Sequence, residues 1–265
     1  YEESMALLEE AGIKIPGGKR TLLVPARNFP VEVLFLRDDD IPESVASGVA
    51  DVGIVGLNEV MEKRCPVGVL KKLGFGKCRL SLAIPQDIDY QDRNWFSGKK
   101  IATSYPGILS DYLHKNGIVS DIHVITGSVE IAPGIRLADA IFDIVSSGST
   151  LVSNRLKEVE TVVESEAVLI GTDSISPEKR GILDELLFRF DSVQAADDKK
   201  YILMNVPQKK LNDVLSVLPG IKSPTVMRLA DKEWCSVHTV LDEKCFWEII
   251  NRLKTAGAEG ILVLD

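Results

Sequence analysis

Residues 138–151 read Ala138-Asp-Ala-Ile-Phe-Asp-Ile-Val-Ser-Ser-Gly-Ser-Thr-Leu151, the strongest local signal in the chain. The apolar first half predicts a strand, and a helix is expected after the loop that follows it. That loop consists of Ser146, Ser147, Gly148, Ser149 and Thr150. Hydroxyls and a glycine let the backbone approach an anion, so that N–H and O–H groups donate to its oxygens. Because the loop has no lysine and is not a Walker A sequence, we expect a monophosphate held mainly by neutral donors.

Two aspartates belong to this predicted strand. Asp139 and Asp143 are four residues apart and therefore face the same side, about 13 Å from each other at ~3.3 Å per residue. Only Asp143 is close to the loop, where a carboxylate can accept hydrogen bonds from a ribose diol. Asp139 is better explained as structural. The competing interpretation of the whole motif is a plain turn capped by serines, which needs no aspartate in the strand.

An earlier stretch resembles this one. Residues 47–56 and 135–144 each contain a helix end, then Ala-Asp, then an apolar strand and a turn that opens a helix. The two aspartates, Asp51 and Asp139, lie about 88 positions apart. Two lobes built on one plan explain this similarity, and such lobes place a ligand cleft at the carboxyl ends of their strands. Chance is the alternative, since Ala-Asp before an apolar run is common.

Strands and helices alternate along the first 190 residues, which predicts an α/β fold with parallel sheets flanked by helices. Helices are expected after Pro42 and over residues 58–64, 109–115 and 178–190, and strands over 31–36, 52–55, 80–84 and 100–103.

Residues 197–265 have a pattern of their own. Strands are expected over 201–206, 226–229, 234–240 and 261–264, and helices over 210–217 and 243–256. This βαββαβ order is that of ferredoxin-like domains. The segment holds ten acidic and ten basic residues, whereas residues 1–196 hold 29 acidic and 21 basic ones. We therefore predict a separate domain.

Composition excludes several classes of protein. The 265 residues are 45% hydrophobic and 26% charged, as in globular proteins. A net charge of −8 argues against nucleic-acid binding, and no apolar stretch approaches the ~20 residues of a membrane helix. No secretory leader is visible, so we expect a cytoplasmic protein. The four cysteines lack metal or redox spacing, and the three histidines are scattered, so zinc sites and Ser-His-Asp triads are weakly supported.

Residues 138–151 resemble the signature of the ATP phosphoribosyltransferase family, and other segments agree in the right order along nearly the whole chain. They are Leu36-Arg-Asp-Asp-Asp-Ile-Pro42, Ala50-Asp-Val-Gly-Ile-Val-Gly56, Ile101-Ala-Thr-Ser-Tyr-Pro106, Gly127-Ser-Val-Glu-Ile-Ala-Pro133, Pro219-Gly-Ile-Lys-Ser-Pro-Thr225 and Leu253-Lys-Thr-Ala-Gly-Ala258. The last two resemble the C-terminal domain of the family's long form.

The resemblance implies an α/β fold with two lobes like those of periplasmic binding proteins, plus a C-terminal ferredoxin-like domain. We expect residues 1–85 with 166–190 to form catalytic lobe I, 86–165 lobe II, and 197–265 a regulatory domain. The implied enzyme is a glycosyltransferase that uses Mg²⁺ to move the 5-phosphoribosyl group of phosphoribosyl pyrophosphate to N1 of ATP. This is the first step of histidine biosynthesis, with L-histidine as allosteric inhibitor and self-association to dimers and hexamers.

The resemblance also implies roles for single residues. Ser146 to Thr150 match the loop that binds the 5′-phosphate, and Asp143 matches the acid on the ribose hydroxyls. Glu130 matches an acid of the active cleft and is a candidate for Mg²⁺, although a helix N-terminal carboxylate explains it equally well. Arg37 resembles a residue that meets the nucleotide or diphosphate; a surface arginine is the alternative.

Further positions follow from the same resemblance. Tyr105 and Asn58 resemble positions against the adenine and its sugar, and a packed core aromatic is the other account of Tyr105. The expected histidine-effector positions are Asn205, Ser223, Thr225 and Ala258.

The start of the chain departs from the family's pattern. The family usually opens with a strand and a loop carrying Lys and a Gly-Arg-Leu run, whereas this sequence begins with Tyr1, beyond that point. We expect a lobe without this strand to have an open edge. Two other classes stay open from sequence alone: a two-lobed solute-binding protein without catalysis, and a regulatory amino-acid sensor that has lost its chemistry.

Overall fold

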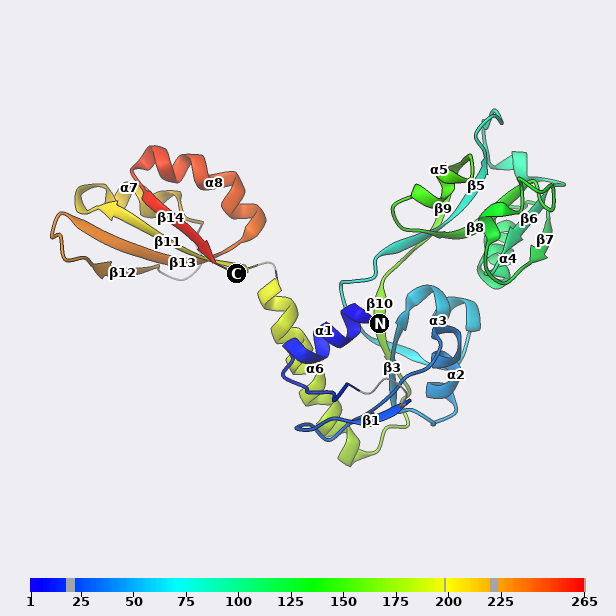
Figure 1. Cartoon of the computed structure of the whole chain (residues 1–265), viewed down its shortest axis with the longest axis horizontal. Coiled ribbons are helices and arrows are strands. Elements are labelled where there is room, and N and C mark those ends of the chain that lie inside the picture. Colours follow the sequence, from blue (N-terminus) through cyan, green and yellow to red (C-terminus); the bar gives the residue numbers. More distant parts are fainter. Residues whose placement is uncertain (18–21, 198, 220–223, 265) are drawn as a thin grey trace. The chain divides into compact units, whose positions relative to one another are not determined.

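The computed structural model describes residues 1–17, 22–197, 199–219 and 224–264. The chain divides into two compact units, Tyr1–Phe190 and Asp191–Asp265 (Figure 1). Helix α6 (Pro177–Asp197) runs through the division. Within the first unit, two separate main sheets define two lobes.

Lobe I is built on the antiparallel sheet β3-β10-β4, which comprises Val52–Gly56, Ala167–Gly171 and Gly68–Lys72. A two-stranded ribbon, β1 (Leu23–Pro25) with β2 (Glu32–Leu34), accompanies it. The helices of this lobe are α1 (Glu2–Glu10), the 3₁₀ turn η1 (Asp38–Asp40), α2 (Ile41–Ala46), α3 (Leu57–Lys63) and the first part of α6. Val45, Val55, Val168 and Ile170 form a buried cluster between α2 and the sheet.

Lobe II is built on the five-stranded sheet β7-β6-β8-β5-β9. Its strands are β5 (Cys78–Pro85), β6 (Lys100–Thr103), β7 (Asp121–Val124), β8 (Ala140–Val145) and β9 (Leu156–Ser165). Helices α4 (Pro106–Lys115) and α5 (Ser149–Ser153) and the 3₁₀ turns η2 (Arg93–Phe96) and η3 (Val129–Ile131) connect them. Each face of the sheet carries its own buried cluster, one around Phe142 and one around Ile141.

The expectation of parallel sheets was wrong for much of this unit. Among the described residues of this unit, only β7-β6-β8 is parallel; β5, β9 and the whole β3-β10-β4 sheet pair antiparallel. The reason is the route of the chain, which leaves lobe I along β5 and returns along β9. Strand β10 therefore enters lobe I from the other lobe rather than through a helical crossover.

The predicted end of lobe I at residue 85 also differs from the sheets. Strand β5 pairs with β8 and β9 in the sheet of lobe II, so sheet membership changes before Cys78. The similarity between residues 47–56 and 135–144 corresponds to equivalent elements: β3 runs directly into α3, and β8 runs through a short loop into α5.

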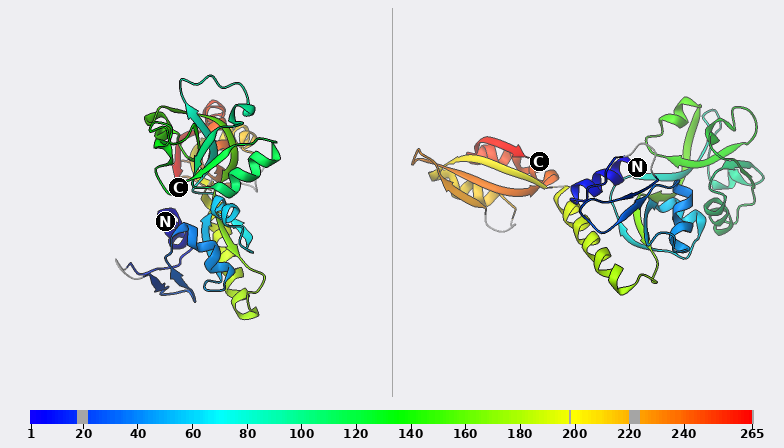
Figure 2. Two further views of the ribbon diagram at one scale, coloured as in Figure 1. Left: turned by 90° about the vertical axis from the view of Figure 1, so that its right-hand side faces the viewer. Right: turned by 60° about the horizontal axis from the view of Figure 1, so that its bottom comes forward.

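The second unit contains β11 (Lys199–Pro207), η4 (Gln208–Lys210), α7 (Leu211–Val217), β12 (Thr225–Arg228), β13 (Trp234–Asp242), α8 (Glu243–Ala256) and β14 (Glu259–Leu264). Its sheet is antiparallel in the order β12-β13-β11-β14, which confirms the ferredoxin-like prediction. Figures 1 and 2 show both helices on one face of this sheet, where Ile202, Val237 and Phe246 are buried. Across the described ranges, no helix combines the length and apolar character needed to cross a membrane.

Candidate active site

Asp143 lies near the end of β8, opposite Ser81 of β5. Its side chain is half-buried, and its Oδ1 accepts a 2.8 Å hydrogen bond from the backbone N–H of Ile144. Burial raises the pKa of this carboxyl, the Ile144 N–H opposes the shift, and the nearby charge of Glu130 adds to it. Asp143 and Glu130 therefore share one electrostatic environment, although 13 positions separate them.

The loop Ser146–Thr150 follows β8 as the sequence predicted, with helix α5 beginning at Ser149. Gly148 has φ +80°, a left-handed conformation that side-chain-bearing residues rarely adopt. The hydroxyls of Ser147 and Ser149 lie 3.0 Å apart. Thr150 is exposed, and its carbonyl accepts a 2.9 Å hydrogen bond from the Asn154 side chain. The loop thus turns sharply and leaves hydroxyl and backbone groups open to a ligand.

An ion pair that the sequence analysis missed supports this loop. Arg79 of β5 donates to the Ser146 carbonyl over 3.1 Å and binds Glu158 of β9 through Nε at 2.6 Å and Nη2 at 2.5 Å. Ser81 and Thr161 also donate to Glu158, at 2.7 and 3.2 Å. These donors, with Arg79 first, lower the pKa of Glu158 to about 2. The signal in the sequence was a charged residue, Arg79, inside a mostly apolar strand.

The other side of the site comes from lobe I. Asn58, at the start of α3, is buried, and its Oδ1 accepts a 2.8 Å hydrogen bond from Ser165. Its amide nitrogen donates to Glu59 at 3.0 Å and to the Tyr105 hydroxyl at 3.3 Å. The side-chain amide of Asn58 therefore has hydrogen-bond partners for both its oxygen and its nitrogen within the chain. These bonds hold Glu59 and Tyr105 in place beside it.

Tyr105 precedes α4 in lobe II and is 9% exposed. Its hydroxyl donates to Glu59 over 2.9 Å. Burial, the Glu59 carboxylate and the charge of Asp143 all raise the pKa of Tyr105. Tyr105 of lobe II is thus bonded to Asn58 and Glu59 of lobe I. Burial also raises the pKa of Glu59.

Two other predicted residues of the first unit, Arg37 and Asp139, take part in bonds of their own. Arg37 is 81% exposed and pairs with Asp39 at 3.5 Å. Asp39 contributes to the environment of Glu59, so the Arg37 turn adjoins the lobe I side. Asp139 lies just before β8 rather than within it, and its carboxylate accepts the Lys100 N–H at 2.9 Å. That bond fixes the start of β6 and explains Asp139 structurally.

Glu130 lies in the 3₁₀ turn η3 and is half-buried. With Asp143 it offers two carboxylates near the phosphate loop. Among the described residues, no group of three or more His, Cys, Asp or Glu side chains converges as a metal site. Two carboxylates suit Mg²⁺, which commonly takes one or two from the protein and fills its other positions with water and substrate phosphates.

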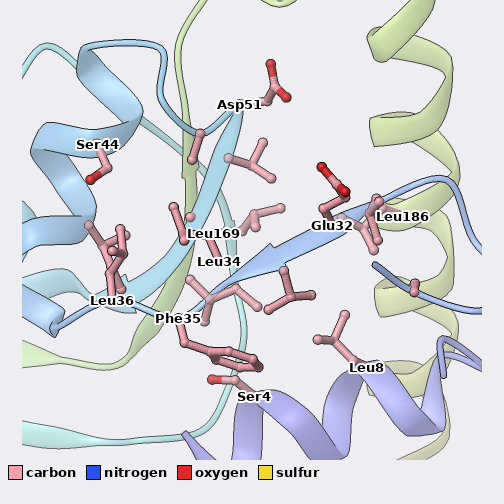
Figure 3. A pocket seen from close by; sticks show the side chains of 18 of the residues that line it. Ser4, Leu8, Glu32, Leu34, Phe35, Leu36, Ser44, Asp51, Leu169 and Leu186 are labelled. Atoms are coloured by element: carbon pink, nitrogen blue, oxygen red, sulfur yellow. The ribbon is translucent and has the colours of Figure 1, made fainter. Parts of the chain in front are cut away.

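A cavity of about 800 Å³ lies elsewhere, in lobe I (Figure 3). Side chains of α1, β2, β3, β10 and α6 and of the segment after β2 line it, including Leu8, Leu34, Phe35, Leu169 and Leu186 (Figure 3). Within the described residues β2 pairs with β1 and β3 pairs with β10, so the two strands do not pair with each other. None of the predicted site residues lines this largely apolar cavity, so we do not assign it to the candidate active site.

In the second unit, Asn205 of β11 and Thr225 of β12 lie on the sheet face opposite the helices. Asn205 is opposite Glu259 at the start of β14, close to buried Ala258. Thr225 is opposite His238, and two strands, β13 and β11, separate its strand from β14. Ser223 lies outside the described residues. Asn205 and Ala258 are thus near each other, whereas Thr225 belongs to the far edge.

Comparison with known proteins agrees with this fold. The HisG family model, described as ATP phosphoribosyltransferase, matches residues 37–192, and the model of the HisG C-terminal domain matches 196–265. The ATP phosphoribosyltransferase of Bacteroides fragilis is 69% identical over 264 residues, covering 100% of this chain and 93% of that protein. That of Cytophaga hutchinsonii is 57% identical over 263 residues, covering 99% and 92%.

Solved structures give the same picture. A chain of the HisG:HisZ ATP phosphoribosyl transferase complex from Thermotoga maritima matches with a TM-score of 0.64 and 25% identity, over 74% of this chain and 94% of that one. The substrate binding protein of an amino acid ABC transporter matches with a TM-score of 0.50 and 12% identity, over 74% and 80%, which is a likeness of fold alone. The two family models and the full-length relatives show that this chain belongs to the ATP phosphoribosyltransferase family, in its long form with a C-terminal domain.

Proposed function

We propose that the chain transfers the 5-phosphoribosyl group of phosphoribosyl pyrophosphate to N1 of ATP, giving phosphoribosyl-ATP and pyrophosphate. The observation that supports the residue roles is the position of Asp143 near the end of β8, just before the loop Ser146–Thr150. Relatives at 69% identity that are named ATP phosphoribosyltransferase favour this enzyme over a solute-binding protein or a sensor. The reaction opens histidine biosynthesis, a cytoplasmic pathway.

The chemistry makes few demands on the protein. The adenine N1 lone pair attacks C1 of the ribose while the C1–O bond breaks and its electron pair leaves with pyrophosphate. The substrate carries its own leaving group, so the protein has to position the reactants and stabilise charge. Ser146 to Thr150 hold the 5′-phosphate. The half-buried Asp143 carboxylate accepts hydrogen bonds from the ribose hydroxyls and faces the positive charge that develops on the ring.

The nucleotide side is formed by Tyr105 and Arg37. Tyr105 offers an aromatic face to the adenine, with its hydroxyl held by Glu59 and Asn58. Arg37, an exposed cation that pairs with Asp39, binds the phosphates of ATP or of the leaving group. Glu130 and Asp143 would hold Mg²⁺, which supplies neutralising charge to the pyrophosphate when it is bound.

The test is pyrophosphate release by the purified protein with ATP, phosphoribosyl pyrophosphate and Mg²⁺. We expect release that needs both substrates. Leaving out ATP separates transfer from simple hydrolysis of phosphoribosyl pyrophosphate. Release that persists without ATP, or no release from folded protein, contradicts the proposal.

For the second unit we propose feedback inhibition by L-histidine, with Asn205 and Ala258 on one side of the effector site and Thr225 on another. Their distance within one chain fits a site completed by a second subunit, as in dimers and hexamers. Asn205→Ala is expected to raise the histidine concentration for half-inhibition about tenfold, the size of one lost hydrogen bond to a charged ligand. Asn212→Ala, on the exposed side of α7, is the control. Equal inhibition curves for both variants contradict the assignment, and light scattering with and without histidine tests assembly.

A further inference from the structure

Helix α3 of lobe I and helix α4 of lobe II contact each other across the boundary between the lobes (Figure 1). Besides Glu59, which binds the Tyr105 hydroxyl, α3 contributes Glu62, one turn further on. The Glu62 carboxylate accepts hydrogen bonds from the backbone N–H groups of Gly107 at 2.8 Å and Ile108 at 2.9 Å. One side chain of lobe I therefore binds two backbone donors of lobe II.

These two donors are the first that α4 has to satisfy. Its N-cap residue, Tyr105, makes no side-chain capping bond, and Pro106 at the first helical position has no N–H. Glu62 supplies the missing cap from the other lobe. A carboxylate is the favoured group at that place, because the helix dipole and the ionised acceptor both strengthen the bonds.

The fit of Glu62 depends on a residue without a side chain. A Cβ placed on Gly107 would lie 3.0 Å from Glu62 Oε1 and 3.2 Å from its Cδ and Oε2, closer than ordinary van der Waals contact. Gly107 does not have a positive φ, so its backbone conformation does not itself require glycine. The close approach of the carboxylate is the reason that the structure offers for glycine at this position.

A second contact at the same boundary is weaker. Arg64 donates to the Gly107 carbonyl at 2.9 Å and pairs with Asp111 at 2.7 Å. The Arg64 and Asp111 side chains are 54% and 71% exposed, and exposed pairs of this kind contribute little to stability. Of the two side chains that bind the backbone of Gly107, Glu62 therefore makes the stronger contact.

We propose that Glu62 is a positioning residue that fixes lobe I to lobe II at the start of α4 and thereby holds Tyr105 in place for the nucleotide. Tyr105 is two residues before the first backbone N–H that Glu62 binds, so losing these bonds removes a restraint on the backbone next to Tyr105, whose hydroxyl stays bonded to Glu59 and Asn58. The phosphate loop and Asp143 belong to lobe II alone and do not depend on it. The inference rests on the proposed function for its kinetic readout, but its structural readout does not.

The test compares Glu62→Ala, Gly107→Ala and two matched controls in the full chain. Glu43→Ala removes an exposed glutamate of the neighbouring helix α2, and Gly181→Ala adds a methyl group where α6 leaves open space. Hydrogen exchange measured without substrates is expected to speed up at the amides of residues 107 and 108 in the first two variants only.

In the same two variants the KM for ATP is expected to rise, about tenfold for Glu62→Ala as one charge-assisted bond pair is lost, and less for Gly107→Ala. The calorimetric Kd for phosphoribosyl pyrophosphate should stay unchanged, whereas general destabilisation would weaken both ligands. If Glu62→Ala does not fold, the same two measurements, hydrogen exchange and the KM for ATP, are made on Gly107→Ala and Glu62→Gln instead. Wild-type exchange rates at residues 107 and 108 together with a wild-type KM for ATP overturn the inference. Failure of the wild type to release pyrophosphate would refute the proposed function. The hydrogen-exchange result would still test whether Glu62 holds the start of α4.

Discussion

The amide nitrogen of Asn58 lies 3.3 Å from the hydroxyl of Tyr105, although the two residues are 47 positions apart and belong to different lobes. Asn58 is itself anchored by Ser165, the last residue of β9, whose hydroxyl donates to Asn58 Oδ1 at 2.8 Å. Strand β9 is the segment by which the chain returns to lobe I. The aromatic residue of the nucleotide side is therefore tied to the connection between the lobes.

Tyr105→Phe tests the hydrogen bonds that connect Tyr105 to lobe I. The variant keeps the ring but loses hydrogen bonds to Glu59 and Asn58, so we expect the free energy of unfolding to fall by about 1 kcal/mol. The hydroxyl also lowers the pKa of Glu59, which burial raises, so NMR titration should show that pKa rising further. The KM for ATP should increase. Tyr112→Phe, which loses a 3.4 Å bond to Glu160, is the control, and an equal change in both variants would refute the tie.

Asp143→Asn separates binding from stability. We expect the variant to bind phosphoribosyl pyrophosphate more weakly by about 1–3 kcal/mol, the range for a hydrogen bond to a charged group. Because burial raises the pKa of Asp143, the folded state holds its proton more tightly than the unfolded state does. The ionised carboxylate therefore opposes folding as pH rises past its usual pKa, and removing it should not reduce stability at neutral pH.

Calorimetry and chemical denaturation at pH 7 measure both effects. Asp89→Asn changes an exposed aspartate of the same lobe and serves as the control. Unchanged affinity in Asp143→Asn would remove Asp143 from the ribose site.

Periodicity and local motifs were enough for much of the fold. The helix Glu243–Ala256 and the strand Lys100–Thr103 have the bounds that the sequence predicted, because glycine and charged residues mark their ends. Whether neighbouring strands pair parallel or antiparallel was harder to predict from the sequence. Strand β10 is an apolar run that looks the same in a parallel or an antiparallel sheet, and its pairing with β3 depends on the return of the chain from lobe II.

The residues of the site likewise fall into those that the sequence could predict and those that it could not. Asp143 and its loop are contiguous, so their spacing could be recognised in the sequence. Arg79 and Glu158 are 79 positions apart and meet only through the register of β5 with β9, which contains two irregularities. Glu62 also showed no local signal, since its partners are backbone groups of another lobe.

Glu158→Gln tests whether the ion pair of Arg79 with Glu158, which supports the loop at Ser146, contributes to stability in a pH-dependent way. The lowered pKa, from its usual 4.5 to about 2, means that ionised Glu158 stabilises the fold above pH 4.5 and that this contribution is lost as pH falls towards 2. The Arg79 and Glu158 side chains are 34% and 24% exposed, so solvent screens part of the effect and we expect a loss of about 1 kcal/mol at pH 7.

The difference in unfolding free energy between wild type and Glu158→Gln should shrink as pH is lowered from 5 to 2. Glu164→Gln, an exposed glutamate of the same strand, should show no such convergence. If the difference between wild type and Glu158→Gln stays constant from pH 5 to 2, the ionised Glu158 carboxylate does not stabilise the fold through Arg79.

Gly148→Ala tests the shape of the phosphate loop. The nearest heavy atom to a Cβ at this position is Val145 Cγ1 at 3.9 Å, so there is room for the methyl group and only the backbone conformation at φ +80° is strained. We expect a loss of about 1 kcal/mol in unfolding free energy, the cost of a left-handed conformation for a residue with a Cβ. The loop should relax by changing its backbone angles, which moves the N–H of Ser149 and weakens binding of phosphoribosyl pyrophosphate.

Gly98→Ala is the matched control, because Gly98 also has a positive φ, +72°, with open space around it, but lies in a loop of lobe II away from the site. Both variants should lose similar stability in denaturation, and only Gly148→Ala should lose affinity in calorimetry. Gly148→Asn should recover part of that affinity, since asparagine tolerates the left-handed region better than alanine. Equal affinity in Gly148→Ala and Gly98→Ala would mean that the turn at Gly148 shapes the fold alone, and the 5′-phosphate would then have to be held elsewhere.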